Sequence, residues 1–391
     1  MTMATKNDIF KEYKAEYFKA TKERKGEILE LVCAVIKIHR KAAIRKFSRL
    51  QKKDPSKEDY RGRPTYYTPD VTAALKDVWE WASEICGELL HSCIAEHIDI
   101  LERDKKWKYG NEITGKLRAM SERTMKRRVA LFMKARLGKG VSSTSPSLLK
   151  EIIPIFDGKW NEVIPGHGQI DTVVHCGASL IGDMAYTLNY TDVRTFWIVP
   201  RAQWNKGQEA TRANVESVRD QLPFTLFSIH PDSGGEFINW HMKDWCDTNK
   251  IKMTRSRPNH SNDNMHVEER NGHVVRRFLG YIRIDCKEAI PVMNDFYRVL
   301  GLYLNHFIPS RKCIEKMRVG SKYRRKYDKA QTPYQRVLAS PDIPEEAKEK
   351  LRKEHATLNP RVLKEEWEKL RDMIFDVQKR YGSRAQSEKN G

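Results

Sequence analysis

The sequence predicts a multidomain protein with helical units at its N-terminus, an α/β core on a mixed sheet, and a mainly helical C-terminal region. Its 391 residues suffice for two to four domains. A Gly/Ser-rich stretch, 138–147, separates helical spacing of apolar residues from short β-branched and aromatic runs. The net charge of +20 falls to −2 over residues 151–282 and is basic on both sides of them. We therefore expect four segments, 1–64, 65–145, 146–285 and 286–391.

The composition argues against two broad classes of protein. No apolar run reaches the roughly 18–20 residues that cross a bilayer, and the opening residues MTMATKNDIFKEYK lack the apolar stretch of a signal peptide. Seven scattered cysteines without a C-x-x-C pair are typical of reduced thiols. Cys86, His91, Cys93 and His97 match no zinc-finger spacing, so we expect them in a core. We expect a cytoplasmic, nucleoid-associated protein, and its pI near 9.5 favours a polyanion as partner.

The first segment has the pattern of a helix-turn-helix. Residues 25–36 carry apolar side chains at helical spacing, and a short break at Lys37–Ile38 precedes a second helix with Ala43, Ile44, Phe47 and Leu50 on one side. Residues 37–53 hold eight basic side chains and no acidic one. A short helix, a turn and a basic helix are typical of DNA binding, although an ordinary helical hairpin with a solvated basic face has the same pattern. The candidate DNA contacts are Arg40, Lys41 and Arg45.

The second segment repeats this arrangement on a larger scale. Thr68, Pro69 and Asp70 have the residue types of a helix start. Residues 103–139 then hold thirteen basic and three acidic side chains, and Ser121 is placed to cap a basic helix. A second helix-turn-helix and a plain helical scaffold both fit this pattern. The candidate DNA contacts here are Arg123, Lys126 and Arg127.

The third segment alternates between strands and helices. Short runs of β-branched and aromatic residues predict strands at 168–177, 184–193, 195–202, 224–232 and 251–258. Helical spacing predicts helices at 206–222, 234–250 and 262–282. Three consecutive strands followed by alternation predict a mixed five-stranded sheet with helices packed on it. The first and fourth strands are then neighbours, so Asp171 and Asp232 can converge, while Asn264 and Asn271 share the helix face of Glu268.

The fourth segment is basic and mainly helical. We expect helices at 290–307, 344–357 and 361–378, followed by a polar tail. Residues 311–329 form a basic segment interleaved with aromatic side chains, which favours phosphate contact over base reading. The candidate contacts are Arg324 and Arg325, while Arg276 and Arg277, on the predicted helix of Glu268, are either DNA contacts or a solvated helix face.

The third segment also carries a set of motifs with a shared resemblance. They are Gly168-Gln-Ile-Asp171-Thr-Val, His175-Cys-Gly, Asp192, Thr195-Phe-Trp, Trp204-Asn-Lys206, Leu222-Pro-Phe, Asp232-Ser-Gly-Gly-Glu-Phe-Ile-Asn239, Thr254-Arg-Ser-Arg-Pro258, Asn262-Asp-Asn-Met-His-Val-Glu268, Asn271, Val275-Arg-Arg277 and Tyr327-Asp-Lys-Ala-Gln-Thr-Pro-Tyr-Gln-Arg336. This set resembles the catalytic core of DDE transposases and retroviral integrases, most closely that of bacterial insertion-sequence transposases. Ser233 stands where relatives often have Asn, and the N-terminal zinc module of retroviral integrases is missing.

The resemblance implies an RNase H-like fold and a catalytic triad of Asp171, Asp232 and Glu268. These carboxylates would hold two Mg²⁺ ions, for which Mn²⁺ can substitute, in a two-metal in-line reaction. The implied activity is cleavage at transposon ends and joining of the freed 3′-OH to target DNA, on double-stranded DNA, by a homo-oligomer of at least two chains. Two alternatives are a helix-turn-helix regulator with a non-catalytic core and an RNase H-like nuclease without strand transfer.

Overall fold

The computed structural model describes residues 3–52, 66–132, 163–231, 235–255, 267, 271–319 and 322–383. It divides the chain into two compact units, Met1–Tyr66 and Tyr67–Gly391. The second unit contains most of the predicted segments 65–145, 146–285 and 286–391 together, so their separation into further domains stays a prediction. No described helix has the length and apolar character needed to cross a membrane.

The first unit is a small cluster of helices, whose described elements are α1 (Met3–Glu12), α2 (Lys14–Lys19), α3 (Lys22–Ile36) and α4 (Arg40–Lys52). Thr21 caps α3 by accepting the Arg24 amide at 3.4 Å, and Lys37 ends it in a left-handed conformation. The two predicted helices are therefore confirmed. Ile44 is a correction: it is 39% exposed, because it lies about 100° around the helix from the buried Ala43, while Phe47 returns to the buried side.

The second unit begins with four helices: α5 (Pro69–Trp81), α6 (Gly87–Arg103), α7 (Asn111–Arg118) and α8 (Glu122–Phe132). Proline occupies the first turn of α5, as the sequence predicts. Ser121 accepts the Thr124 amide at 3.4 Å at the start of α8. Cys93 and His97 are buried on α6, in agreement with the expected core role, whereas Cys86 and His91 are only partly buried.

A five-stranded mixed sheet forms the centre of the second unit. Its order is β3-β2-β1-β4-β5, with β1 antiparallel to β2, β2 antiparallel to β3, and β4 parallel to both β1 and β5. The bounds are β1 (His167–Val174), β2 (Ala185–Asp192), β3 (Ile198–Trp204), β4 (Ser228–Pro231) and β5 (Lys252–Met253). This confirms the predicted mixed five-stranded sheet and the pairing of its first and fourth strands, an arrangement that fits an α/β RNase H-like core.

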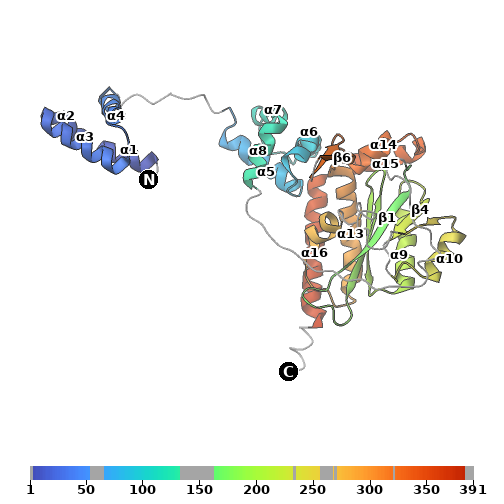
Figure 1. The fold of residues 1–391 in the computed structure, drawn as a ribbon. Coiled ribbons are helices and arrows are strands. Elements are labelled where there is room, and N and C mark those ends of the chain that lie inside the picture. Colours follow the sequence, from blue (N-terminus) through green and yellow to red (C-terminus); the bar gives the residue numbers. More distant parts are fainter. Residues whose placement is uncertain are drawn as a thin grey trace. The chain divides into compact units, whose positions relative to one another are not determined.

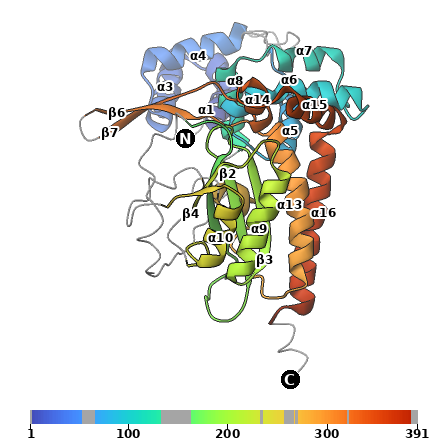
Figure 2. The same ribbon diagram turned by 90° about the vertical axis from the view of Figure 1, so that its right-hand side faces the viewer.

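Side chains alternate between the two faces of this sheet, and each face has its own core. Ile170 and Leu188 pack with α9 (Gln208–Gln221) and α10 (Trp240–Thr248). Val173 and Ala185 pack on the opposite face with α13 (Ala289–Phe307), which is backed by α16 (Pro360–Tyr381). Figures 1 and 2 show these two layers of helices on either side of the sheet.

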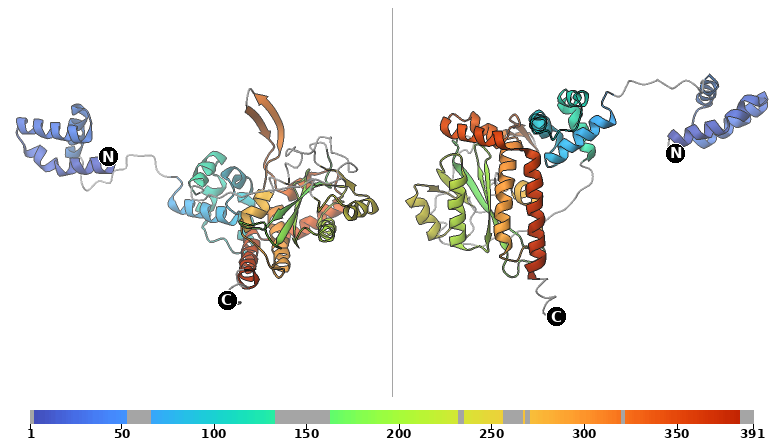
Figure 3. Two further views of the ribbon diagram at one scale, coloured as in Figure 1. Left: turned by 60° about the horizontal axis from the view of Figure 1, so that its bottom comes forward. Right: turned by 180° about the vertical axis from the view of Figure 1, so that it is seen from behind.

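The remaining C-terminal elements include one feature that the sequence pattern did not predict. The helices α14 (Pro333–Ala339) and α15 (Glu345–Thr357) precede α16. The basic segment 311–329 contains a two-stranded antiparallel hairpin, β6 (Cys313–Val319) and β7 (Lys322–Tyr327). It projects from the body of the second unit (Figure 3). Side chains on such a hairpin are exposed on both faces, as Ile314 and Met317 are, so no alternation of apolar and polar residues reveals it.

Candidate functional site

Asp171 lies in the middle of β1, on the sheet face that packs against α13. In the antiparallel ladder it stands directly opposite Asn189 of β2. Its Oδ2 accepts a hydrogen bond from Asn271 Nδ2 at 2.6 Å, and its Oδ1 accepts the Thr172 amide at 2.7 Å. Asn189 Nδ2 in turn donates to Asn271 Oδ1 at 3.0 Å. A chain of two amides therefore orients the carboxylate from the neighbouring strand and from the π-helical turn η5 (Asn271–Arg276).

The other two predicted acids, Asp232 and Glu268, lie outside the described residues, but their chain neighbours are described. Pro231, which precedes Asp232, pairs with Ile170 in the parallel ladder. Val267, which precedes Glu268, is buried and donates its amide N–H to Gln169 Oε1 at 3.1 Å. The residues that directly precede Asp232 and Glu268 are therefore held against β1 within two residues of Asp171. In the part of the chain that the structure describes, no three His, Cys, Asp or Glu side chains form a metal-binding group.

An ion pair between a buried carboxylate and a partly exposed lysine fixes the chain that follows Asp232, and the sequence did not single it out as a functional feature. Glu236 is buried, accepts a hydrogen bond from Thr172 Oγ1 at 2.8 Å and pairs with Lys206 Nζ at 2.9 Å. Burial raises the pKa of this carboxyl, but the hydrogen bond and charge of Lys206, together with hydrogen bonds from Thr172 and the Glu236 backbone, outweigh burial, so its pKa is below the ordinary value. Asn239 then caps α10 by accepting the Met242 amide at 2.9 Å. Glu236 and Asn239 both belong to the motif that starts at Asp232, and that motif was the signal in the sequence that could have identified them.

Two other motif residues have structural roles. His175 is fully buried, shares a 2.8 Å hydrogen bond with Thr187 Oγ1, and has its pKa lowered to about 3 by burial and by the charge of Arg276. It is therefore neutral at pH 7 and unsuited to proton transfer there. Asp192 accepts the Gly166 amide at 2.8 Å and the Thr195 amide at 2.7 Å, which fixes the turn between β2 and β3.

Comparison with known proteins gives one informative relative. No family model matches the chain. The uncharacterized protein y4rM of Sinorhizobium fredii is 31% identical over 329 residues, covering 84% of this chain and 93% of the relative. The chain belongs to the family of y4rM. Among solved structures, the catalytic core domain of BIV integrase is similar at a TM-score of 0.29 and 14% identity, covering 44% of this chain and 93% of that one. A TM-score this low does not support a fold assignment, so the fold is described by its strand order.

The predicted DNA contacts of this family member fall into two groups. The exposed ones are Arg40, Lys41 and Arg45 on α4, Arg123, Lys126 and Arg127 on α8, and Arg324 and Arg325 on β7. Within this group, Lys126 forms an ion pair with Glu88. The second group consists of Arg276, which is partly buried, and Arg277, which is also exposed; both already donate to backbone carbonyls. Arg276 donates to the Val174 carbonyl at 2.8 Å, and Arg277 donates to the Ser83 carbonyl.

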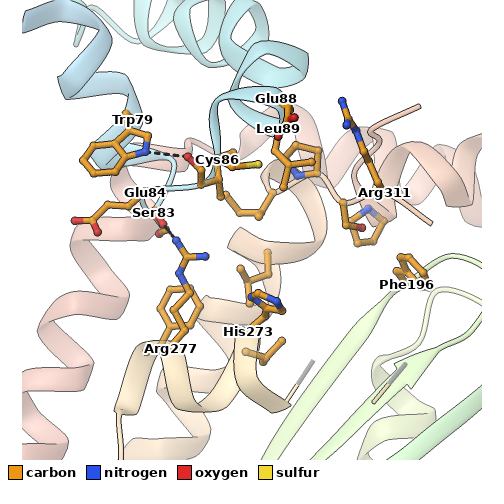
Figure 4. A pocket seen from close by; sticks show the side chains of 18 of the residues that line it. Trp79, Ser83, Glu84, Cys86, Glu88, Leu89, Phe196, His273, Arg277 and Arg311 are labelled. Atoms are coloured by element: carbon orange, nitrogen blue, oxygen red, sulfur yellow. Dashed lines mark hydrogen bonds between the residues drawn. The ribbon is translucent and has the colours of Figure 1, made fainter. Parts of the chain in front are cut away.

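Arg277 also lines a cavity of about 930 Å³ between the α5–α6 corner and the core. Figure 4 shows its side chain pointing toward Ser83, with His273 beside it. Tyr303 of α13 donates to the Trp81 carbonyl at 2.6 Å and shares a 2.8 Å hydrogen bond with the Ser83 hydroxyl. Arg277 and Tyr303 together hold the α5–α6 corner against the core. We therefore assign Arg277 a packing role in addition to any contact with DNA.

Proposed function

We propose that this protein is a metal-dependent DNA transposase that cleaves phosphodiester bonds at transposon ends and joins the freed 3′-OH ends to target DNA. One observation carries the proposal. Asp171 is oriented by Asn271, while the residues before Asp232 and Glu268 are tied to Ile170 and Gln169 of the same strand. The motifs shared with insertion-sequence transposases and integrases support the same assignment.

The residues present suit hard divalent cations. Asp171, Asp232 and Glu268 would hold two Mg²⁺ ions, because carboxylate oxygens are the ligands that Mg²⁺ prefers. When bound, the ions stabilise charge on the attacking and leaving oxygens of an in-line displacement. Asn271 keeps the Asp171 carboxylate in one orientation, and the Lys206–Glu236 pair holds the chain that follows Asp232. In this reaction water and then the freed 3′-OH would be the nucleophiles, so no covalent protein intermediate is required.

Double-stranded DNA, both transposon ends and target, is the proposed substrate. The basic helices α4 and α8 would act as the recognition helices of helix-turn-helix units. Exposed cations on β7 would contact phosphates. Two DNA ends must be held together for transposition, so a dimer or larger homo-oligomer forms on DNA, in association with the nucleoid.

The test compares joining with binding. Duplexes from the DNA that flanks this gene serve as ends and a supercoiled plasmid serves as target, with Mg²⁺ present. Asp171→Asn and Asp232→Asn should each lower joining by about 100-fold or more, because loss of one ligand carboxylate removes several kcal/mol of charge stabilisation. DNA affinity, measured in EDTA, should stay within about twofold.

Asp244→Asn makes the same chemical change on the exposed face of α10 and should leave both readouts unchanged. Joining at the wild-type rate by either triad variant would refute the proposal. Cleavage without joining by the wild-type protein would identify a nuclease. DNA binding with neither reaction would identify a regulator.

A further inference from the structure

A second cavity, of about 310 Å³, lies at the base of the β6–β7 hairpin. Three cationic side chains line it: Arg194 from the turn between β2 and β3, Lys312 directly before β6, and Arg336 from α14. Asp328, directly after β7, is the one carboxylate among its lining residues that the structure describes. The cavity is separate from the sheet face that carries Asp171, and the proposed reaction does not use it.

Lys312 is buried, with a residue exposure of 6%, and has no matching anion among the described residues. Its Nζ donates to the Val193 carbonyl at 3.3 Å, and no described carboxylate lies within ion-pair distance of it. Burial, followed by the charges of Arg194 and Arg336, lowers the pKa of Lys312 to about 8, although the charges of Asp192 and Asp328 oppose this shift. A buried ammonium that a carbonyl alone contacts is costly, because charges inside a protein need a counter-charge.

The carboxylate of this cavity is already committed to other groups. Asp328 Oδ2 pairs with Arg336 at 2.6 Å, and Asp328 Oδ1 accepts the backbone N–H of Lys312 at 2.6 Å. Arg336 donates a second hydrogen bond to the Ser310 carbonyl at 2.9 Å, yet its buried Nε has no partner among the described residues. Asp192, the other nearby acid, is not among the lining residues: it is buried under the turn, where burial raises its pKa and hydrogen bonds from Thr195, Gly166 and Arg194 oppose that rise. The positive charge lining the cavity therefore exceeds the negative charge.

The cavity is also rigid. Two of its cations lie over the ring of Phe196, with Lys312 at 6.0 Å and Arg336 at 5.3 Å from the ring centroid. The ring is held by a turn that the buried Asp192 carboxylate fixes through the Gly166 and Thr195 amides. Three cations on a fixed frame are preorganised for an oxyanion such as phosphate.

We propose that this cavity binds a backbone phosphate of DNA. The hairpin favours DNA over a free anion: β6 begins immediately after Lys312, β7 ends immediately before Asp328, and both strands project outward (Figure 3). Arg324, Arg325 and Lys326 are exposed on β7, with Arg324 and Lys326 on one face and Arg325 on the other, so both faces of the strand that ends at the cavity carry cations. Several cations beside the cavity match a polymer that carries one phosphate per 3.4 Å of each strand. The inference rests on the proposed function only in taking DNA as the ligand.

The test measures binding without catalysis. The full-length protein is titrated in EDTA into a fluorescent 30-base-pair duplex at several salt concentrations. Lys312→Gln and Arg194→Gln should each weaken binding about tenfold, the loss expected for one charged hydrogen-bonding group. Each should also reduce the slope of log affinity against log salt by about 0.9, since one phosphate contact is lost. Lys369→Gln removes the same charge from an exposed position on α16 and should change neither quantity.

A parallel calorimetric titration with inorganic phosphate separates the two sources of the anion. Loss of phosphate binding in the variants with unchanged DNA affinity would assign the cavity to a free anion and overturn the proposal. Unchanged DNA affinity and salt slope in both variants overturn it as well. Arg194 is exposed, so its variant decides the matter if Lys312→Gln does not fold. If the variants bind DNA more weakly but the wild-type protein never joins DNA, the phosphate site would be supported and the transposase proposal would be refuted.

Discussion

Replacing Lys312 by methionine should stabilise the protein in the absence of DNA. The pKa of Lys312 falls from 10.5 to about 8 in the folded state. Each pKa unit corresponds to about 1.36 kcal/mol, so the buried charge costs on the order of 3 kcal/mol at neutral pH. Methionine keeps the length and packing of the side chain without the charge. We expect a gain of about 1–3 kcal/mol in the free energy of unfolding, because apolar replacements of buried charges often stabilise by that amount.

The pH dependence of this gain tests its cause. Below pH 8 both the folded and the unfolded state carry the proton on Lys312, so the full cost is present and methionine has its full advantage. Between pH 8 and 10.5 the folded state has lost the proton that the unfolded state keeps, so the cost falls as the pH rises. Thermal unfolding at pH 7 should show a rise of about 2–6 °C for the variant, and more than half of that should vanish by pH 9.5. Equal melting temperatures at pH 7, or a gain that grows with pH, would show that the buried charge is not the cause.

Two further predictions concern the frame around the sites. Gly87→Ala should destabilise the second unit by about 1–3 kcal/mol in urea unfolding, because the added Cβ meets the Lys126 backbone at 2.5 Å. Gly115→Ala, where a Cβ has open space, should instead stabilise the unit by about 0.5–1 kcal/mol. Equal effects of the two substitutions would contradict the close approach of α6 to α8. Lys206→Met should cost about 1–3 kcal/mol at pH 7, less than a fully buried pair because Lys206 is 43% exposed, and Lys206→Met/Glu236→Leu should recover most of it. Because the pKa of Glu236 is lowered in the folded state, the pair stabilises the protein above about pH 4.5, and the effect of Lys206→Met should fade as the pH drops below that value. A loss of stability that does not depend on pH would exclude the ion pair as its source.

The sequence predicts the fold well where packing leaves a periodic signal. Apolar spacing predicted the helix at 290–307, and the structure has it at Ala289–Phe307. The order of strands predicted the β1–β4 pairing that brings Ile170 beside Pro231. The β6–β7 hairpin was not predicted, because its stability comes from backbone pairing and its exposed faces carry no alternation.

The candidate site divides in the same way. The motifs predict Asp171 as a site residue, and helical spacing places Asn271 on the helix face of Glu268; the structure adds the hydrogen bond between Asn271 and Asp171. Lys206, Glu236 and Arg336 belong to the motifs, but their pairing, and the cavity around Lys312, were not predicted because their members come from distant segments of the chain. Such clusters depend on tertiary packing, for which local spacing gives no signal.

The basic cavity and the acidic site need opposite electrostatic surroundings, which gives a physical reason for the uneven distribution of charge along the chain. A site that binds metal needs carboxylates held by neutral donors, because a nearby cation would compete with the metal for the same oxygens. Asn271 and the Thr172 amide are such donors to Asp171, while the cations Lys206 and Arg276 of the same region have Glu236 and the Val174 carbonyl as partners. A site that binds phosphate needs the opposite, and the cavity around Lys312 gathers cations that its single carboxylate does not neutralise. If both proposals hold, DNA would be positioned by the basic cavity and the hairpin, and would reach the acidic centre only when metal ions occupy it. Divalent cations should then strengthen DNA binding by the wild-type protein more than by Asp171→Asn, and an equal effect on both would argue against this coupling.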